Sequence, residues 1–391
     1  MPKVMVMKCD HYQVETIRIK LESALMLLGG VHRLIPRGSR VFLKVNLLTG
    51  KEPSEAVTTH PAVVQALASL LLEAGMEVTI GDSPGGPFLS GRMDRIYRIT
   101  GMKKAAEMSG ARLNQNLESG EVVFPQAFRL KRFDMMQAVL EADAVISLCK
   151  MKTHSMTQMT GAVKNVFGVM PGLTKAALHF RFPQLEDFAH AMVDICEKVN
   201  PIISVMDGIE AMEGPGPSAG AVNQAGVLLV STCPHHLDLA AARWMGMDPN
   251  QAPLLVAARQ RELCHLDGRN LEWVGIRPES VNQKPFKMPP THEPDFLLRY
   301  GSTPFLGRML QVFSQRYMRP KPVINLFRCI RCGECAVICP AQVITMTPDP
   351  VIRMDACIRC FCCQEICPVK AVEIKRSRLL NGFHPAKNAG K

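Results

Sequence analysis

The stretch CIRCGECAVICP, residues 329–340, is repeated as CIRCFCCQEICP at residues 357–368. The interval between the two copies is 28 residues, and a Pro-Val-Ile triplet precedes each of them, at 322–324 and 350–352. Two copies of one small unit predict a pseudo-two-fold domain of about 55 residues. A domain so short cannot bury enough apolar surface by itself, so it needs a cross-link to stay folded.

Cysteine is the residue that can supply this cross-link. Nine of the 14 cysteines lie between residues 321 and 391, whereas a disulfide scaffold would spread them through a small secreted chain. Each copy fits the spacing C-x2-C-x2-C-x3-C-P, and three thiolates so closely spaced can wrap one iron–sulfur cubane. The alternative is a pair of zinc knuckles, but tetrahedral zinc usually takes two separated C-x2-C pairs. The spacing therefore favours 4Fe-4S clusters.

The cysteine spacing resembles that of bacterial two-cluster ferredoxins, in which the fourth cysteine of each run ligates the other cluster. The resemblance implies one 4Fe-4S cluster held by Cys329, Cys332, Cys335 and Cys367, and a second held by Cys357, Cys360, Cys363 and Cys339. Cys362 is left over and is not expected to bind iron. The five cysteines of the first 320 residues are expected to be small buried residues.

The composition of the whole chain is that of a folded protein with more than one domain. It has 391 residues, of which 47% are apolar and 21% charged, and this predicts two or three domains and excludes disorder.

The net charge is +11, but there is no Lys/Arg-rich block and aromatic residues make up only 6%, so no nucleic-acid partner is predicted. No run of about 18 uncharged apolar residues occurs, and the apolar start at 4–7 is too short for a signal peptide. We therefore expect no membrane span and a cytoplasmic location.

Strand and helix patterns alternate through the first 250 residues. Short apolar runs predict strands at 4–8, 41–45, 78–80, 144–148, 202–205 and 227–230. Longer amphipathic segments predict helices at 14–28, 61–74, 93–108, 134–141, 184–199 and 237–245. This alternation predicts an α/β fold, with a mostly parallel sheet flanked by helices. The cysteine repeat is expected to add a small α+β domain that is ferredoxin-like.

Changes in composition set the expected domain boundaries. Residues 1–276 are predicted to form the large α/β domain, and residues 321–378 the two-cluster domain. Between them, the proline-rich residues 277–320 are expected to connect the two, with one helix at 306–317. Residues 379–391 are expected to form a flexible basic tail.

Polar and glycine-rich segments follow four of the predicted strands. In an open parallel sheet, ligands bind beyond the carboxyl ends of the strands, so these segments form the candidate site. The candidates for catalysis are Lys44, Asp82, Lys152 and His154, and those for binding a cofactor are Thr160, Gly161, Lys164, Asn165, Asp207 and Glu213. Lysines beside a helix that opens at a glycine suit a carboxylate or a phosphate. The histidine could transfer protons.

Each of these residues also has a purely structural interpretation. The lysines could be solvated surface residues, and Asp82 and Asp207 could stabilise turns. The chain contains neither G-x-G-x-x-G nor G-x-x-x-x-G-K-[ST], so a standard dinucleotide or nucleoside-triphosphate site is not predicted. It is the shared position of these residues at one sheet edge that indicates a site.

Six segments of the large domain carry a resemblance to a known family. These segments are 43–47, 58–61, 80–86, 150–154, 160–168 and 207–217, and they resemble the domain of unknown function 362 family. One departure is Val45, where relatives often have proline. The family has no general assigned reaction, so the resemblance implies where the site lies and leaves its chemistry open.

The fusion of the two domains favours an iron–sulfur oxidoreductase. Its two 4Fe-4S clusters would relay electrons between a redox partner protein and an anionic substrate or cofactor in the large-domain crevice, because a tether raises the local concentration of the donor. The first alternative is a non-catalytic electron carrier or assembly protein that docks a partner redox enzyme. The second is a non-redox enzyme that uses the clusters structurally.

Overall fold

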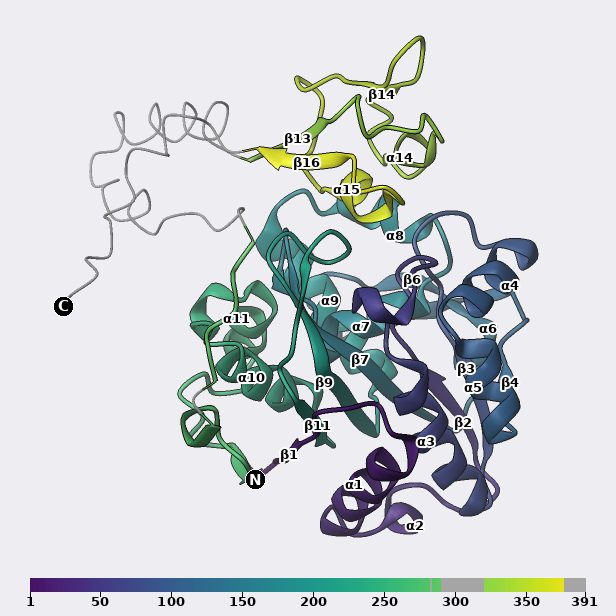
Figure 1. Cartoon of the computed structure of the whole chain (residues 1–391), viewed down its shortest axis with the longest axis vertical. Coiled ribbons are helices and arrows are strands. Elements are labelled where there is room, and N and C mark those ends of the chain that lie inside the picture. Colours follow the sequence, from purple (N-terminus) through teal and green to yellow (C-terminus); the bar gives the residue numbers. More distant parts are fainter. Residues whose placement is uncertain (282, 290–319, 376–391) are drawn as a thin grey trace, which may run out of the picture.

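The structure is a computed structural model that describes residues 1–281, 283–289 and 320–375 (Figure 1). The helix expected at 306–317 and the tail expected at 379–391 lie outside the described residues. Among the helices inside those ranges, none has both the length and the apolar character needed to cross a bilayer.

A mostly parallel sheet forms the centre of the large domain, with the strand order β12-β1-β11-β9-β7-β2-β3-β4. These strands are β1 (Lys3–Lys8), β2 (Arg40–Lys44), β3 (Glu77–Gly81), β4 (Arg112–Leu113), β7 (Ala144–His154), β9 (Ile203–Glu213), β11 (Val227–Ser231) and β12 (Glu272–Gly275). Neighbours from β9 to β4 are parallel, and β11 runs against both of its neighbours. The short strands β8 (Gln158–Met159) and β10 (Ala221–Asn223) pair with β7 and β9. The expected α/β class is confirmed.

Helices cover both faces of this sheet. One face is packed by α1 (Val14–Leu27), α3 (Pro61–Glu73), α4 (Ser90–Ile99) and α5 (Met102–Ser109). The other is packed by α7 (Ala162–Asn165), α9 (Leu185–Val199), α10 (Pro234–Trp244) and α11 (Pro253–Gln260). The short helices α2 (Val31–Leu34), α6 (Gln137–Leu140) and α8 (Thr174–Arg181) complete this part. All eleven residues of β7 are buried, as expected for a strand covered on both faces.

Three local predictions differ from the structure. The helix expected at 93–108 is interrupted between α4 and α5, where Gly101 has a left-handed φ of 74°. The helix expected at 134–141 begins as strand β6 (Arg132–Met136), whose exposed and buried residues alternate and which pairs with β5 (Ser119–Val123). Strands β7 and β9 also continue beyond their expected ends, because they remain paired with each other past residue 150.

Residues 320–375 form a small domain with an internal repeat. Strand β13 (Lys321–Ile324) pairs with β16 (Val372–Lys375), and β14 (Ile344–Thr345) pairs with β15 (Val351–Ile352). Two short helices, α14 (Glu334–Val337) and α15 (Cys362–Ile366), lie between them in the chain. Left-handed backbone recurs 28 residues apart in the pairs Arg331 and Arg359, Gly333 and Phe361, and Gln342 and Lys370. The sequence repeat is therefore also a repeat of backbone conformation.

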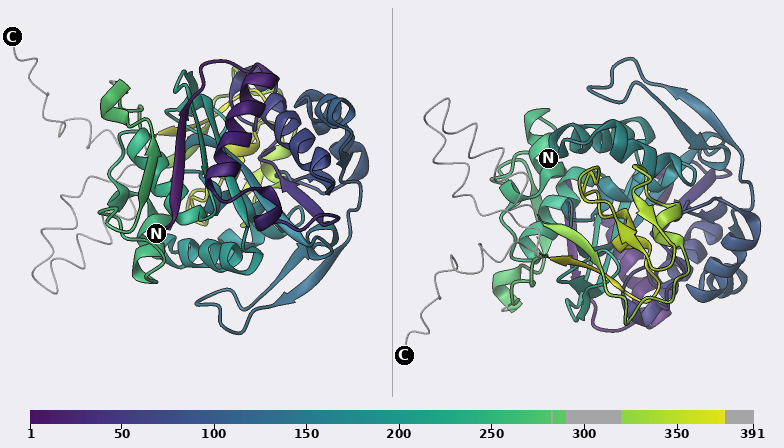
Figure 2. Two further views of the ribbon diagram at one scale, coloured as in Figure 1. Left: turned by 90° about the horizontal axis from the view of Figure 1, so that it is seen from below. Right: turned by 90° about the horizontal axis from the view of Figure 1, so that it is seen from above.

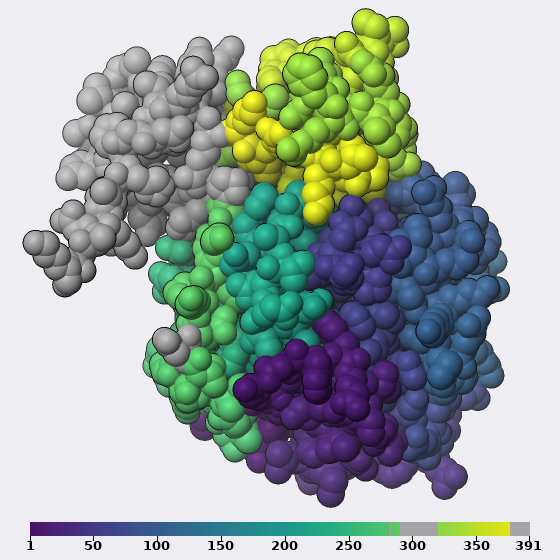
Figure 3. Space-filling view, viewed as in Figure 1, coloured from purple at the N-terminus to yellow at the C-terminus, as the bar shows by residue number. Residues whose placement is uncertain are grey.

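The small domain sits on the edge of the sheet where the parallel strands end, as Figure 1 and Figure 2 show. Strand β7 ends at His154, whose Nε2 lies 3.2 Å from Oε1 of Glu365 in α15. Next to it, Nε2 of Gln364 donates a hydrogen bond to the carbonyl of Pro215 at 2.9 Å. In the space-filling view, the yellow atoms of the small domain rest directly on the large domain (Figure 3).

Candidate functional site

A cavity of about 90 Å³ lies where the small domain meets the carboxyl ends of the parallel strands. Helix α15 closes one side of it with Cys362, Glu365 and Ile366. Its polar walls in the large domain are Lys44, Asn46, Asp82, Ser83, Lys152, His154, Thr160, Lys164, Asn165, Lys175 and His179. Seven of the ten candidate residues named from the sequence are therefore brought together.

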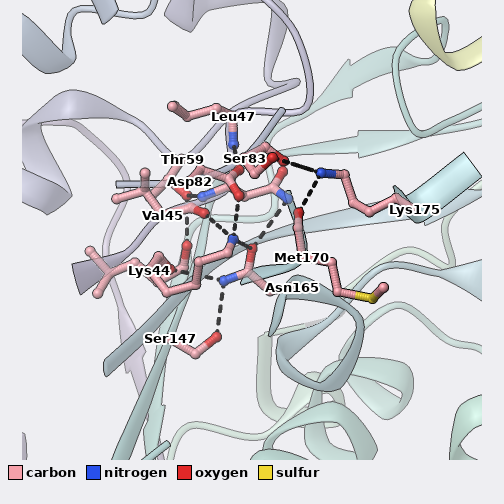
Figure 4. A network of polar contacts seen from close by, with 12 residues as sticks. Lys44, Val45, Leu47, Thr59, Asp82, Ser83, Ser147, Asn165, Met170 and Lys175 are labelled. Atoms are coloured by element: carbon pink, nitrogen blue, oxygen red, sulfur yellow. Dashed lines mark hydrogen bonds and ion pairs between the residues drawn. The ribbon is translucent and has the colours of Figure 1, made fainter. Parts of the chain in front are cut away.

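Lys44 is fully buried and forms an ion pair with Asp82, whose Oδ1 lies 2.7 Å from Nζ (Figure 4). Nζ also donates to the carbonyl of Val45, and the second carboxylate oxygen accepts from the N–H of Leu47, both at 2.7 Å. Burial lowers the pKa of Lys44, and the charge of Asp82 opposes this shift. Gly168 is required beside the pair, because a Cβ there would collide with both charged groups. These two opposite charges therefore satisfy each other inside the protein.

Asn165 fixes the walls around this pair. Its Nδ2 donates to the carbonyl of Lys44 at 3.0 Å and to Oγ of Ser147 in β7 at 2.9 Å. Its Oδ1 accepts from Nδ2 of Asn46 at 3.3 Å. Because every polar atom of this amide is engaged, Asn165 holds β2 and β7 in place and has little capacity left for a ligand.

Within residues 1–281, 283–289 and 320–375, no carboxylate forms an ion pair with Lys152 or Lys164. Lys152 is 1% exposed and donates to the carbonyl of Val57 at 2.7 Å. Among the described residues, Nζ of Lys164 forms no hydrogen bond or ion pair, and it lies 5.7 Å from the centre of the Phe167 ring. Burial and then the charge of Lys164 lower the pKa of Lys152 to about 7. Burial also lowers the pKa of Lys164.

Lys175 reaches the cavity from α8. Its Nζ donates to the carbonyl and to Oγ of Ser83, at 2.8 and 2.9 Å, and to the carbonyl of Met170 at 2.8 Å. These partners are neutral, so they satisfy its donors without cancelling its charge. Burial lowers the pKa of Lys175 to about 7.

His154 and Glu365 meet across the domain boundary. Nδ1 of His154 accepts hydrogen bonds from the backbone N–H groups of Met156 at 3.0 Å and Thr157 at 3.3 Å, so the neutral ring carries its proton on Nε2. Nε2 is 3.2 Å from Oε1 of Glu365, but the two atoms are not aligned as a hydrogen bond. Burial lowers the pKa of His154 to about 4. Burial alone would raise the pKa of Glu365, but the positive groups around it lower that pKa to about 2.

Gly161 does not line the cavity. It precedes α7, whose first N–H groups, those of Ala162 and Val163, donate to the carboxylate of Asp238 at 2.6 and 3.1 Å. A Cβ at position 161 would collide with that carboxylate, and its φ of +84° favours glycine. The helix opening that was expected to bind an anion is therefore occupied by a carboxylate of the chain itself.

Asp207 and Glu213 also lie away from the cavity. Asp207 accepts hydrogen bonds from Nζ of Lys150 at 2.8 Å and from the hydroxyl of Tyr12 at 2.9 Å. Glu213 accepts from Nδ2 of Asn223 at 2.9 Å. Both carboxylates are held by neighbouring side chains of the large domain, and both lie in strand β9, so Asp207 is not the turn residue that the sequence allowed.

The eight cysteines expected to bind iron line two separate cavities of the small domain. The first cage is lined by Cys329, Cys332, Cys335 and Cys367, and the second cage by Cys339, Cys357, Cys360 and Cys363. Each group is the set that the ferredoxin pattern assigns to one cluster, and all of these thiols are free. The donors and their grouping therefore fit a 4Fe-4S cluster in each cage. Over the described ranges, no three His, Cys, Asp or Glu side chains are arranged around a single metal ion.

Cys362 forms the wall between the second cage and the large cavity, because it lines both. Its side chain is buried. The first cage shares no lining residue with the large cavity, and its Cys332 is exposed. The second cage is thus the one that adjoins the cavity.

Two family models match the chain. The model of a domain of unknown function, DUF362, matches residues 41–243, more than half of the chain. The chain belongs to the DUF362 family. A 4Fe-4S dicluster domain matches residues 328–371, so the DUF362 domain is followed by a domain of the ferredoxin type.

Two known proteins resemble this DUF362 protein. A thylakoid-associated protein of a Synechocystis species is 30% identical over 259 residues, which cover 65% of this chain and 78% of that protein. The lactate racemase apoprotein of Thermoanaerobacterium thermosaccharolyticum matches with a TM-score of 0.39 and 12% identity. That match covers 62% of this chain and 57% of the racemase chain, less than two thirds of its length. It is too slight to bear on fold or function.

The cavity is built jointly by the DUF362 domain and the ferredoxin-type domain. Glu365 and Cys362, which come from the second domain, were not among the cavity residues expected from the sequence. The repeat itself contains a signal that could have found them. At the equivalent positions 28 residues earlier, the first copy has Val337 and Glu334. The second copy therefore departs from the repeat at the two polar positions that face the cavity.

Proposed function

We propose that this DUF362 protein is an iron–sulfur oxidoreductase that acts on an anion bound in the cavity between its two domains. The observation that carries this proposal is Cys362, a single residue that lines both the cavity and the second cage. Two 4Fe-4S clusters, held by the crossed cysteine sets, would supply one-electron chemistry when bound. A cluster in the second cage would be separated from the bound anion by one side chain.

Exposed residues beside the first cage support a site for an external redox partner protein. Cys332 of the first cage is exposed, and the neighbouring apolar side chains of Phe327 and Ile330 are 104% and 61% exposed. Exposed apolar side chains close to a redox centre suit transient docking of another protein. For each anion reduced by two electrons in the cavity, a one-electron donor protein would be oxidised twice, and reduction would be coupled to proton uptake by the anion. Oxidation of the anion would run the same exchange in reverse.

His154 supports proton transfer at the same place. Its Nε2–H is the only ring proton of the neutral side chain, and the ring lines the cavity. Because Nε2 is not aligned with Glu365 in a hydrogen bond, it can donate to a bound molecule instead. A positioned histidine of this kind contributes to proton transfer in many enzymes.

The experiment is anaerobic purification of the full chain, followed by iron analysis, EPR and mass spectrometry of any released small molecule. We expect about eight irons per chain, as two 4Fe-4S clusters require, and oxidation of the dithionite-reduced clusters when the released molecule is added. His154→Gln should lower this rate about 10²–10⁴-fold at unchanged iron content. His32→Gln, at an exposed histidine, is the matched control.

Two results would contradict the proposal. The first is a full oxidation rate in His154→Gln. The second is a protein with reducible clusters whose redox state no released molecule changes in either direction, which would favour a non-catalytic electron carrier.

A further inference from the structure

We propose that the cavity selects a compact dianion, a dicarboxylate or a phosphate monoester, over monocarboxylates and neutral molecules. This inference rests on the proposed function for the location of the site and adds the charge of the ligand. It follows from the charges and the free donors that the cavity walls present.

The charged groups of the cavity do not balance. They are four ammonium groups and two carboxylates: Lys44, Lys152, Lys164, Lys175, Asp82 and Glu365. Burial lowers the pKa of His154 to about 4 and that of His179 to about 3, so both rings are neutral near pH 7. The walls therefore hold an excess of two positive charges when the lysines are protonated. Lys152 is fully buried, whereas Lys164 and Lys175 are half-buried. Uncompensated charge so far from bulk water is costly, and a ligand with two negative charges reduces this cost.

Several donors in the walls also lack acceptors. In the ranges that the structure describes, Nζ of Lys164 has no hydrogen-bond partner, and Lys152 uses Nζ for one carbonyl only. In the same described ranges, Oγ1 of Thr160, in a residue that is 95% buried, also has no partner. A ligand with several acceptor oxygens would satisfy these groups together. The volume of about 90 Å³ limits that ligand to a small molecule.

The negative charge of a cluster does not replace such a ligand. The second cage lies behind Cys362, so a cluster there could offset part of the positive charge at a distance. It could not accept hydrogen bonds from Lys152, Lys164 or Thr160, because the Cys362 side chain forms the intervening wall. The unpartnered donors therefore still point to a ligand in the cavity itself.

Binding of a dianion should be coupled to protonation of the lysines. Burial lowers the pKa of Lys152 to about 7, and the charged groups that act on it are Lys164, Lys150, Glu365 and Asp82. A dianion would favour the protonated form, so binding above pH 7 should take up protons. The affinity should then fall as the pH rises above 7, by about tenfold per pH unit for each proton taken up.

The experiment is anaerobic titration calorimetry of the iron-loaded full chain with malonate, succinate, methyl phosphate, sulfate and acetate. We expect at least one organic dianion to bind one site per chain at least tenfold more tightly than acetate. Malonate and succinate report on dicarboxylates, and methyl phosphate on phosphate monoesters.

Lys164→Met should lower the affinity for the tightest-binding dianion at least tenfold, and Thr160→Ala should lower that affinity with the iron content unchanged. Lys103→Met removes the same charge from an exposed position and should leave binding unchanged.

Acetate binding as tightly as every dianion would overturn the inference. Equal loss in Lys164→Met and Lys103→Met would do the same, because it would show an effect of net charge alone. If a monoanion released from the protein oxidises the reduced clusters, the charge assignment fails while the proposed oxidoreductase stands. If the dianions bind as expected but the molecule released from the protein neither oxidises the reduced clusters nor reduces the oxidised ones, this inference stands and the proposed redox reaction is contradicted.

Discussion

Lys150 and Lys152 lie two residues apart on β7, and both are buried, yet their surroundings are opposite. Lys150 faces Asp207 on the neighbouring strand β9, at 2.8 Å, and the hydroxyl of Tyr12 completes a closed network. Lys152 lies beyond an irregularity in the β7–β9 pairing and has a single carbonyl as its partner, with Lys164 nearby. One buried lysine is thus fully paired, and the other is left with an unpaired charge at a cavity.

The two lysines show how a charge that stabilises the fold differs from a charge that is available to a ligand. A buried ion pair whose members satisfy each other contributes to the fold and offers nothing to a ligand. A buried cation without a neighbouring carboxylate destabilises the folded protein, and binding of an anion relieves this cost. Burial of a lysine therefore does not by itself identify a site, whereas burial without a partner does.

The largest expected effect is on the paired lysine. Lys150→Met leaves Asp207 buried without its cation, so the free energy of unfolding should fall by about 3–5 kcal/mol. Lys152→Met removes an uncompensated charge and should leave stability within about 1 kcal/mol of the original or raise it. Urea unfolding of the anaerobic protein, followed by tryptophan fluorescence, measures both. Similar losses in the two variants would remove the distinction between these regions.

The second expected effect is the contribution of Lys152 to the pH dependence of stability. Lys152 keeps its proton up to about pH 7 in the folded protein, against a usual pKa of 10.5. Between these values the unfolded chain binds more protons than the folded chain, so stability should rise with pH from 7 upward. The slope should approach about 1.4 kcal/mol per pH unit for this group. Relative to the original protein, Lys152→Met should lose that component of the slope, and an unchanged slope would contradict the assignment.

The smallest expected effect concerns a partly exposed ion pair between the two domains. Arg92 lies 3.1 Å from Glu334 of α14, with the two side chains 23% and 35% exposed. Water screens such a pair, so Arg92→Ala should cost only about 0.2–1 kcal/mol in the unfolding free energy. The same urea titration measures it. A loss as large as that of Lys150→Met would show that exposure does not govern these pairs.

The sequence was sufficient to predict the sheet and most of the site, for a physical reason. Residues such as Lys44 and Lys152 follow neighbouring parallel strands, and the carboxyl ends of such strands meet at one edge. Asp207 follows a neighbouring strand as well, but the sequence does not show that Lys150 lies directly opposite it. Nor could the sequence show that Asp238, from a distant helix, fills the opening at Gly161.

The part of the site that the sequence could not predict depends on how two domains meet. Glu365 and Cys362 enter the cavity only because α15 rests on the end of β7. Local pattern gives no information about such a placement, since the two segments are separated by about half of the chain. The eight cage cysteines, by contrast, are specified by spacing alone, because each copy of the motif is local.

The five-residue helix α15 also has a practical consequence for handling the protein. Its three cavity residues, Cys362, Glu365 and Ile366, lie next to Cys363 and Cys367, so this wall of the cavity is anchored to the sulfurs that would hold iron. Oxidative loss of a 4Fe-4S cluster would loosen α15 and open the cavity to water. A ligand screen on protein handled in air would then sample a cavity with one wall displaced, and it would not test the proposed binding of small anions.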